Sequence, residues 1–203
     1  MNIIYFMKKS SFVLTLTFFL ICIVAFILEI IYPEFDYFSF IPALAFKRPW
    51  TFVTSIFLHA DFTHLFFNMF ALLMFGIYLE GKISKKSYIL IFLLSGIFGS
   101  LGYMITATDS TIPAIGASGS IYGIMGCLAI LMPYAIVYVS GMPMPMIAAA
   151  FFWAVMELLG VFAPTGNIAH GAHLFGLFIG IFFGIYFKWK KIRINTKYTL
   201  SEF

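Results

Sequence analysis

Charged residues are scarce in this 203-residue chain: Asp, Glu, Lys and Arg make up 10% of it, whereas 63% of the residues are hydrophobic. Soluble globular domains carry about 25% charged residues, so the scarcity excludes an ordinary soluble domain. A membrane-spanning helix needs about 20 mostly apolar residues. Apolar segments of about this length predict six spans, at residues 12–32, 59–79, 87–106, 117–133, 143–162 and 168–187.

Cysteine, repeats and low-complexity segments are also scarce or absent. Cys22 and Cys127 fall inside different predicted spans, where a thiol packs as a small apolar side chain, and two such residues make no disulfide framework. The first apolar stretch is too long for the apolar region of a signal peptide and lacks a convincing cleavage site, so we expect it to remain as a helix. We expect one membrane domain over residues 1–203, with its core at about 12–187 and a short basic tail at 188–203.

Basic residues fall almost entirely on one side of the six predicted spans. Ten of the twelve lie on that side: Lys8, Lys9, Lys82, Lys85, Lys86, Lys188, Lys190, Lys191, Arg193 and Lys197. Because cytoplasmic loops are enriched in Lys and Arg, we expect both termini in the cytoplasm of a multi-pass protein of the plasma (inner) membrane. The net charge of +4 then requires no nucleic-acid partner, since the basic tail suits anionic lipid of the bilayer.

Histidine is restricted to four positions, in two clusters at the starts of predicted spans two and six. They are His59, His64, His170 and His173. Asn68 follows the first cluster, and Gly116-Ala117-Ser118-Gly119 opens span four. Spans two, four and six run in the same direction, so their first turns share one depth, roughly 5–15 Å below the outer surface at 1.5 Å per residue. The sequence therefore predicts that Ser118, His173, His64 and Asn68 lie at one level.

Glycines recur every three or four residues in spans four and six, and such stripes let membrane helices approach backbone to backbone. They are Gly119, Gly123 and Gly126 in span four and Gly176, Gly180 and Gly184 in span six. Close packing along these stripes would bring Ser118 within hydrogen-bond reach of His173. Packing without any chemistry is an equally good explanation of the glycines alone.

Ser118 is the candidate nucleophile, because a serine hydroxyl needs an adjacent base and His173 is best placed to be one. A helix N-terminus favours negative charge that develops nearby, and Gly116 and Gly119 permit a tight backbone there. His64 and Asn68 lie four residues apart on one helix face. Both can donate hydrogen bonds to an oxyanion, although a polar clasp between helices, worth about 1 kcal/mol, would use the same residues.

No acidic residue lies close to His173 in the sequence, so we expect a Ser–His dyad rather than a triad. Glu157, late in the fifth span, is the acid that can in principle reach the site. Tyr122, one turn below Ser118, is placed to stack on the imidazole of His173 in place of a carboxylate, or simply to pack.

A zinc site is the chemical alternative, since the four histidines and Asp61 are possible ligands. The spacing is not that of H-E-x-x-H, no cysteine joins the cluster, and a metal would leave the Gly-flanked Ser118 unexplained. We therefore expect no metal and no cofactor.

Taken in order, these motifs resemble those of the rhomboid intramembrane serine proteases. His59, His64 and Asn68 match the histidine and HxxxN of the second helix, residues 116–119 match the GxSG of the fourth, and 172–180 match the AHxxGxxxG of the sixth. The resemblance covers roughly residues 48–187. It implies an all-α, six-transmembrane-helix rhomboid bundle that hydrolyses peptide bonds in or near transmembrane segments of other membrane proteins, at the outer face.

The resemblance also implies a role for each matching residue. Ser118 would be the nucleophile and His173 the general base, then the acid to the leaving amine. His64, Asn68 and the Ser118 backbone N–H would form the oxyanion hole. The expected supporting residues are Gly116, Gly119, Tyr122, His59 and His170, with Gly123, Gly176 and Gly180 in helix packing and Glu80 as a structural acid. One departure is Thr51 after Trp50, where many members have arginine.

Two other classes of protein remain open. A rhomboid-like protein without catalysis would bind membrane clients, but such proteins are marked by loss of the serine or the histidine, and both are present here. A small transporter would need ionisable residues along a path across the bilayer, whereas the polar residues of this chain collect at one side.

Overall fold

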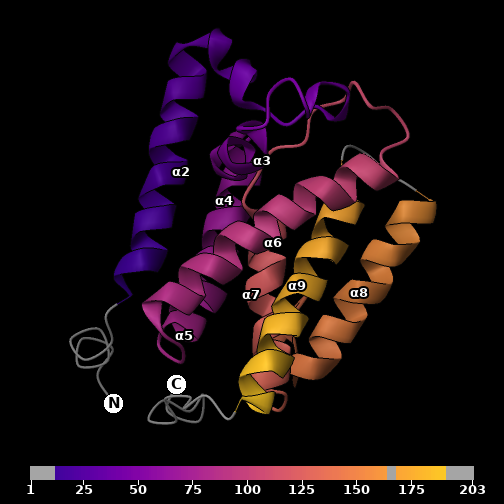
Figure 1. Ribbon diagram of the computed structural model, residues 1–203. Coiled ribbons are helices and arrows are strands. Elements are labelled where there is room, and N and C mark those ends of the chain that lie inside the picture. The colour runs from indigo at the N-terminus through magenta and orange to yellow at the C-terminus, as the bar shows by residue number, and fades with distance from the viewer. Residues whose placement is uncertain (1–11, 164–167, 191–203) are drawn as a thin grey trace.

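The computed structural model describes residues 12–163 and 168–190, most of which form helices (Figure 1). Four helical stretches are long and apolar enough to cross a membrane: Val13–Ile31 (α2), Phe62–Glu80, Lys85–Thr106 (α6) and His170–Trp189 (α9). Two shorter apolar helices, Ser118–Leu131 (α7) and Met146–Phe162 (α8), complete the bundle. Each of the six segments predicted from hydropathy is thus largely helical, and the chain is an integral, multi-pass membrane protein. The basic residues at 8, 9, 191, 193 and 197 lie outside the described residues.

The stretch Phe62–Glu80 consists of three pieces: Phe62–Ala71 (α4), a π-helical turn at Leu72–Gly76 (η4), and Ile77–Glu80 (α5). At its start the Asp61 side chain accepts a hydrogen bond from the His64 backbone N–H at 2.8 Å, which caps the helix. At its end the buried Glu80 carboxylate accepts from the backbone N–H groups of Leu14 and Thr15. These contacts satisfy free donors at the first turn of α2, so Glu80 ties two helices together.

Between α2 and α4 the chain forms short turns of helix: Pro33–Phe38 (η1), Pro42–Leu44 (η2), Thr51–Thr54 (α3) and Ser55–Phe57 (η3). This segment is bonded to the loop that precedes α7. The Ala114 N–H donates to the Phe40 carbonyl at 2.8 Å, and the Ala43 N–H donates to the Ser110 carbonyl at 2.9 Å. The loop that leads to Ser118 is therefore held by hydrogen bonds to a segment outside the helix bundle.

Helix α7 lies at the centre of the bundle, with most of its residues buried between α6 and α9 (Figure 1). A side chain on Gly180 would overlap the carbonyl oxygen of Gly123, and one on Gly176 would overlap that of Gly119. The backbones of α7 and α9 therefore meet along these glycines. Matching positions advance together along both helices, so α7 and α9 run parallel.

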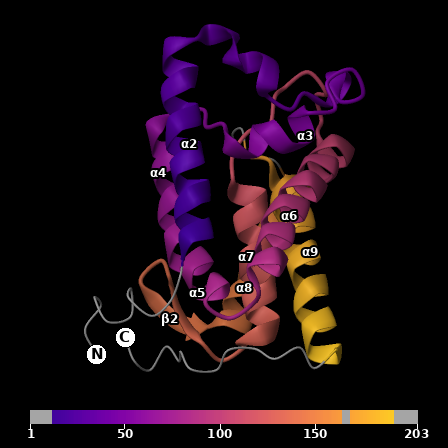
Figure 2. The same cartoon turned by 60° about the vertical axis from the view of Figure 1, so that its left-hand side comes forward.

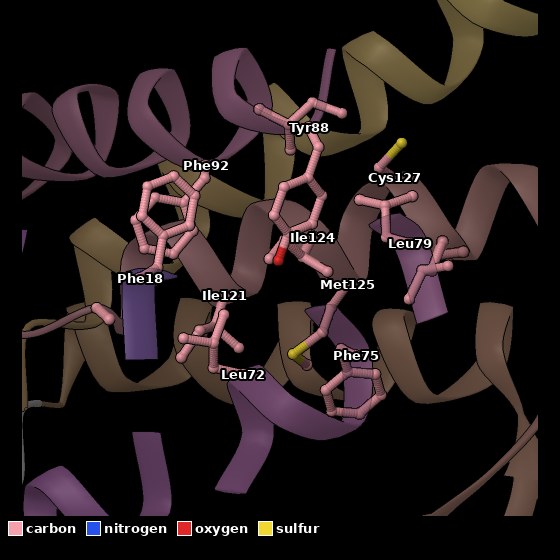
Figure 3. Close-up of a cluster of buried hydrophobic side chains, with 14 of the residues drawn as sticks. Phe18, Leu72, Phe75, Leu79, Tyr88, Phe92, Ile121, Ile124, Met125 and Cys127 are labelled. Carbon is pink, nitrogen blue, oxygen red and sulfur yellow. The ribbon is translucent and has the colours of Figure 1, made fainter. Parts of the chain in front are cut away.

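A second layer of packing joins α2, η4 and α6 to α7 (Figure 3). Phe18 stacks on Phe92 with the ring centroids 4.0 Å apart. The cluster also contains Leu72, Phe75, Leu79, Tyr88, Ile121, Ile124, Met125 and Cys127. Cys22 and Cys127 are both buried free thiols, in agreement with the sequence analysis.

An unexpected β-hairpin joins α7 to α8, at the lower end of the bundle in Figure 2. Strands Ile136–Val139 (β1) and Met142–Pro145 (β2) pair antiparallel around Ser140 and Gly141, both with positive φ, as a tight hairpin turn requires. The predicted start of the fifth span at residue 143 is therefore wrong, because α8 begins at Met146. Pro143 and Pro145 disfavour helical conformation in the residues before them, so this apolar run extends as a strand.

Candidate active site

Ser118 is the first residue of α7 and follows a turn that glycine makes possible. Gly116 has φ +123, a conformation that L side chains rarely adopt, and a side chain there would also meet the His64 ring. The Gly116 N–H donates to the Ser55 carbonyl at 2.9 Å. The half-buried Ser118 thus stands on a fixed turn at a helix N-terminus, where free N–H groups and the helix dipole favour negative charge.

His173 lies in the first turn of α9, and its Nε2 is 2.8 Å from Ser118 Oγ. These residues are 55 positions apart in the chain, and the close approach of α7 and α9 brings them together. The ring of Tyr122 stacks on the imidazole with centroids 4.5 Å apart and planes inclined by 5°. A neutral imidazole with its proton on Nδ1 can accept the serine proton at Nε2.

The carboxylate of Glu157 on α8 lies next to both histidines at the start of α9. Glu157 Oε1 lies 3.0 Å from His173 Nδ1, and Glu157 Oε2 lies 2.6 Å from His170 Nδ1. The Tyr122 hydroxyl donates to Oε1. The contact with His173 is close but bent, and among the described residues His173 Nδ1 has no hydrogen bond of ordinary geometry.

The sequence analysis favoured a Ser–His dyad and left Glu157 as an acid that can in principle reach the site; the structure places its carboxylate beside His173. Glu157 and His173 are 16 residues apart and on different helices, and their meeting depends on how α8 is rotated against α9. The periodicity of one helix gives no information about how that helix is rotated against its neighbour. The available signal was the isolated carboxylate in an otherwise apolar segment, since ionisable residues in membrane helices are rarely without a function.

His64 and Asn68 lie on α4, next to the Ser118 turn. A Cβ atom on Gly116 would be 2.8 Å from His64 Cε1, so the His64 ring borders that turn. Asn68 Nδ2 donates to the His64 carbonyl at 2.9 Å, while its Oδ1 has no partner among the described residues. Within 12–163 and 168–190, no hydrogen bond joins either side chain to Ser118 or His173.

His59 lies next to His64. Its ring centroid is 5.2 Å from that of His64, and its backbone N–H donates to Glu29 Oε2 at 3.0 Å. Its side chain is buried. His64 thus borders the turn before α7, and His173 contacts Ser118 at the start of α7.

A small pocket of about 90 Å³ opens beside His170, where α6 and α8 end and α9 begins. Its polar lining is supplied by Tyr103, Thr106, Thr108, Asp109 and His170. In the part of the chain that the structure describes, no group of three or more His, Cys, Asp or Glu side chains has the arrangement of a metal site. The absence of a metal stays a prediction.

The chain is similar to rhomboid proteins of a bacterium and a plant. A family model described as the rhomboid domain matches residues 47–190. A putative rhomboid protease of Bacillus subtilis, YdcA, is 33% identical over 128 residues, 63% of this chain and 62% of its own length. The rhomboid protease GluP of the same organism is 32% identical over 133 residues, 66% of this chain and 25% of its own.

A third relative carries a different description. The inactive RHOMBOID-like protein 8 of Arabidopsis thaliana is 34% identical over 79 residues, 39% of this chain and 22% of its own length. The matches to these three relatives cover less than two thirds of the length of each. Similarity of this degree therefore extends to proteins described as proteases and to one described as inactive.

Proposed function

The chain belongs to the rhomboid family, and from this premise we propose that it is a serine endopeptidase that cuts peptide bonds in or near transmembrane segments of other membrane proteins. One observation carries the proposal: Ser118 Oγ and His173 Nε2 are 2.8 Å apart at the N-terminus of a buried helix. A nucleophile, a base and a helix N-terminus together meet the requirements of acyl transfer.

The reaction would proceed in two halves. Ser118 Oγ attacks the scissile carbonyl carbon while its proton passes to His173 Nε2. His173 then gives that proton to the leaving nitrogen, the C–N bond breaks, and an acyl ester remains on Ser118. A water molecule attacks the ester and loses a proton to His173. The ester C–O bond breaks, and the proton returns to Ser118 Oγ, which leaves one carboxylic acid and one amine.

The oxyanion of each tetrahedral intermediate needs hydrogen-bond donors that are already in place. We assign this role to the Ser118 backbone N–H, His64 and Asn68. The placement of the His64 ring against Gly116 supports the assignment, as does Asn68 Nδ2, which has a second hydrogen beyond the one it gives to the His64 carbonyl.

The position of the site in the bilayer follows from helix lengths. Helix α7 has 14 residues, about 21 Å at 1.5 Å per residue, whereas the hydrocarbon core is about 30 Å thick. We propose that α7 and α8 also cross the membrane, giving six spans with the termini in the cytoplasm. Ser118 then lies below the outer surface of the plasma (inner) membrane, under the loop that spans residues 107–117.

The substrates would be transmembrane proteins that reach the site from the lipid bilayer. A helical substrate has its carbonyl oxygens in hydrogen bonds, so it must unwind locally before Ser118 can attack. Small or helix-breaking residues near the cut are therefore expected in the substrate.

The proposal is tested by incubating a labelled transmembrane substrate in liposomes with purified wild type, Ser118→Ala and His173→Ala, with and without a chelator. Ser120→Ala is the matched control, because Ser120 is buried two residues further along α7 and its hydroxyl has no partner among the described residues. We expect cleavage by wild type and Ser120→Ala, a loss of at least about 10³-fold in the other two variants, and no effect of chelator.

The alternatives give other results. Cleavage that survives Ser118→Ala would contradict a serine mechanism, and cleavage that chelator abolishes would favour a metal site. A non-catalytic client-binding protein would retain the substrate without cutting it, and its Ser118 would not react with a fluorophosphonate. A small transporter would also fail to cut.

A further inference from the structure

Glu157 is the one charged residue in the 17-residue helix α8, and it is 7% exposed. A carboxylate is costly inside a membrane helix unless donors surround it. Apolar packing would be served as well by leucine or methionine. The position of this acid therefore calls for an explanation beyond packing.

Three donors from two other helices converge on the carboxylate. Oε2 faces His170 Nδ1 at 2.6 Å, and Oε1 faces both the Tyr122 hydroxyl and, at 3.0 Å, His173 Nδ1. The opposite nitrogen of the same imidazole, His173 Nε2, faces Ser118 Oγ at 2.8 Å. Glu157, His173 and Ser118 thus form a chain of contacts that runs from α8 through α9 to α7.

We propose that Glu157 is a positioning residue for His173, and that His170 and Tyr122 hold its carboxylate in place. The inference rests on the proposed function, and it makes the site a Ser–His pair whose histidine is also in contact with an acid. For His173 to accept the Ser118 proton, Nε2 must be free and Nδ1 must carry the hydrogen. A carboxylate beside Nδ1 favours that tautomer and stabilises the imidazolium that forms in the transition state.

The loss of kcat expected on removal of the Glu157 carboxylate depends on how His173 is held. In soluble serine proteases, loss of the acid from the triad lowers kcat by about 10⁴-fold. Here the contact with Nδ1 is bent, and the stacked Tyr122 ring also restrains the imidazole. We therefore expect a smaller loss, of about 10- to 100-fold.

The test compares wild type, Glu157→Gln and Glu157→Asp on a transmembrane substrate, with kcat expressed per active site titrated by a fluorophosphonate. Glutamine keeps the size but not the charge, whereas aspartate keeps the charge on a shorter side chain. Glu80→Gln is the matched control, because Glu80 is also a buried, hydrogen-bonded acid but holds the start of α2. Melting temperatures are measured for all four proteins.

A positioning role predicts that Glu157→Gln lowers kcat per titrated site by about 10- to 100-fold with KM within twofold of wild type, and that Glu157→Asp retains more activity than Glu157→Gln. Glu80→Gln should lower the melting temperature and leave kcat per titrated site unchanged. A purely structural Glu157 would behave as Glu80 does, and that result would overturn the inference.

Three further outcomes are informative. If Glu157→Gln does not fold, His170→Phe removes one hydrogen-bond partner of the carboxylate and should lower kcat about threefold to tenfold; an unchanged kcat would overturn the inference. Cleavage by wild type that does not depend on Ser118 would overturn the proposed function and this inference with it. Ser118-dependent cleavage with an unchanged Glu157→Gln variant would overturn this inference alone.

Discussion

Tyr122 contacts both His173 and Glu157, and the two contacts use different parts of its side chain. The ring stacks on the imidazole, and the hydroxyl donates to the carboxylate. The sequence analysis placed Tyr122 as a substitute for an acid. In the structure it lies beside one, so the restraint of His173 is shared between a ring and a carboxylate.

Substitution at Tyr122 separates the two contacts. Tyr122→Phe keeps the stack and loses a hydrogen bond worth about 1 kcal/mol, so we expect kcat to fall about fivefold. Tyr122→Ala loses both contacts and should cost at least tenfold more. Steady-state cleavage of the transmembrane substrate measures both values. Tyr103→Phe is the control, since the Tyr103 hydroxyl donates to the Ile112 carbonyl in the loop between α6 and α7; equal losses in Tyr122→Phe and Tyr103→Phe would contradict the assignment.

At the scale of elements, the parallel pair of α7 and α9 decides whether Ser118 and His173 meet. The helices touch through glycine backbones, and a methyl group on Gly180 would overlap the Gly123 carbonyl oxygen. This contact lies below the site by two turns of α9. If the helices separate at this contact, Ser118 and His173 also move apart, because each residue lies in the first turn of its helix.

Gly180→Ala should therefore weaken both stability and reactivity. Overpacking of a tight contact costs about 1–3 kcal/mol, so the melting temperature in detergent should fall by several degrees, and fluorophosphonate labelling of Ser118 should slow. Ile185→Ala is the control on α9, because Ile185 is 55% exposed. A Gly180→Ala variant as stable and reactive as wild type would show that the helices have room to separate without consequence.

For the whole molecule, the central question is which face of the membrane carries Ser118. The start of α9 and the loop before α7 lie at one end of the bundle, and the end of α9 and the hairpin lie at the other (Figures 1 and 2). Lys82, Lys85, Lys86, Lys188 and Lys190 belong to the second end. Because cytoplasmic segments are enriched in Lys and Arg, we predict that this second end faces the cytoplasm.

Cysteine labelling measures this orientation directly. In intact cells, a membrane-impermeant maleimide should label Asp109→Cys, whereas Lys190→Cys should be labelled only after permeabilisation. Both positions are exposed, and the native Cys22 and Cys127 are fully buried, so the unsubstituted chain is the control and should not react. The reverse pattern of labelling would place Ser118 toward the cytoplasm and contradict the proposed topology.

Most features that depend on the local sequence pattern could be predicted from the sequence. Apolar length located six helical segments, and Gly116–Gly119 marked the turn at which α7 begins. The ordered motifs indicated the rhomboid family, which the comparisons confirm. The hydropathy pattern failed at residues 143–145, which form part of a hairpin strand instead of a helix start, because hydropathy alone does not distinguish a short apolar strand from a helix.

What the sequence determined by itself is thus the membrane environment, the helices and the side chains available for chemistry, since each depends on neighbours within a few residues. The tertiary structure decided which of those side chains meet. Ser118 reaches His173 because glycine backbones let α7 and α9 touch, and Glu157 reaches His173 because α8 is rotated so that its one carboxylate faces inward. Rotation and separation of helices depend on the packing of every neighbouring helix at once, and no single segment of the chain encodes them.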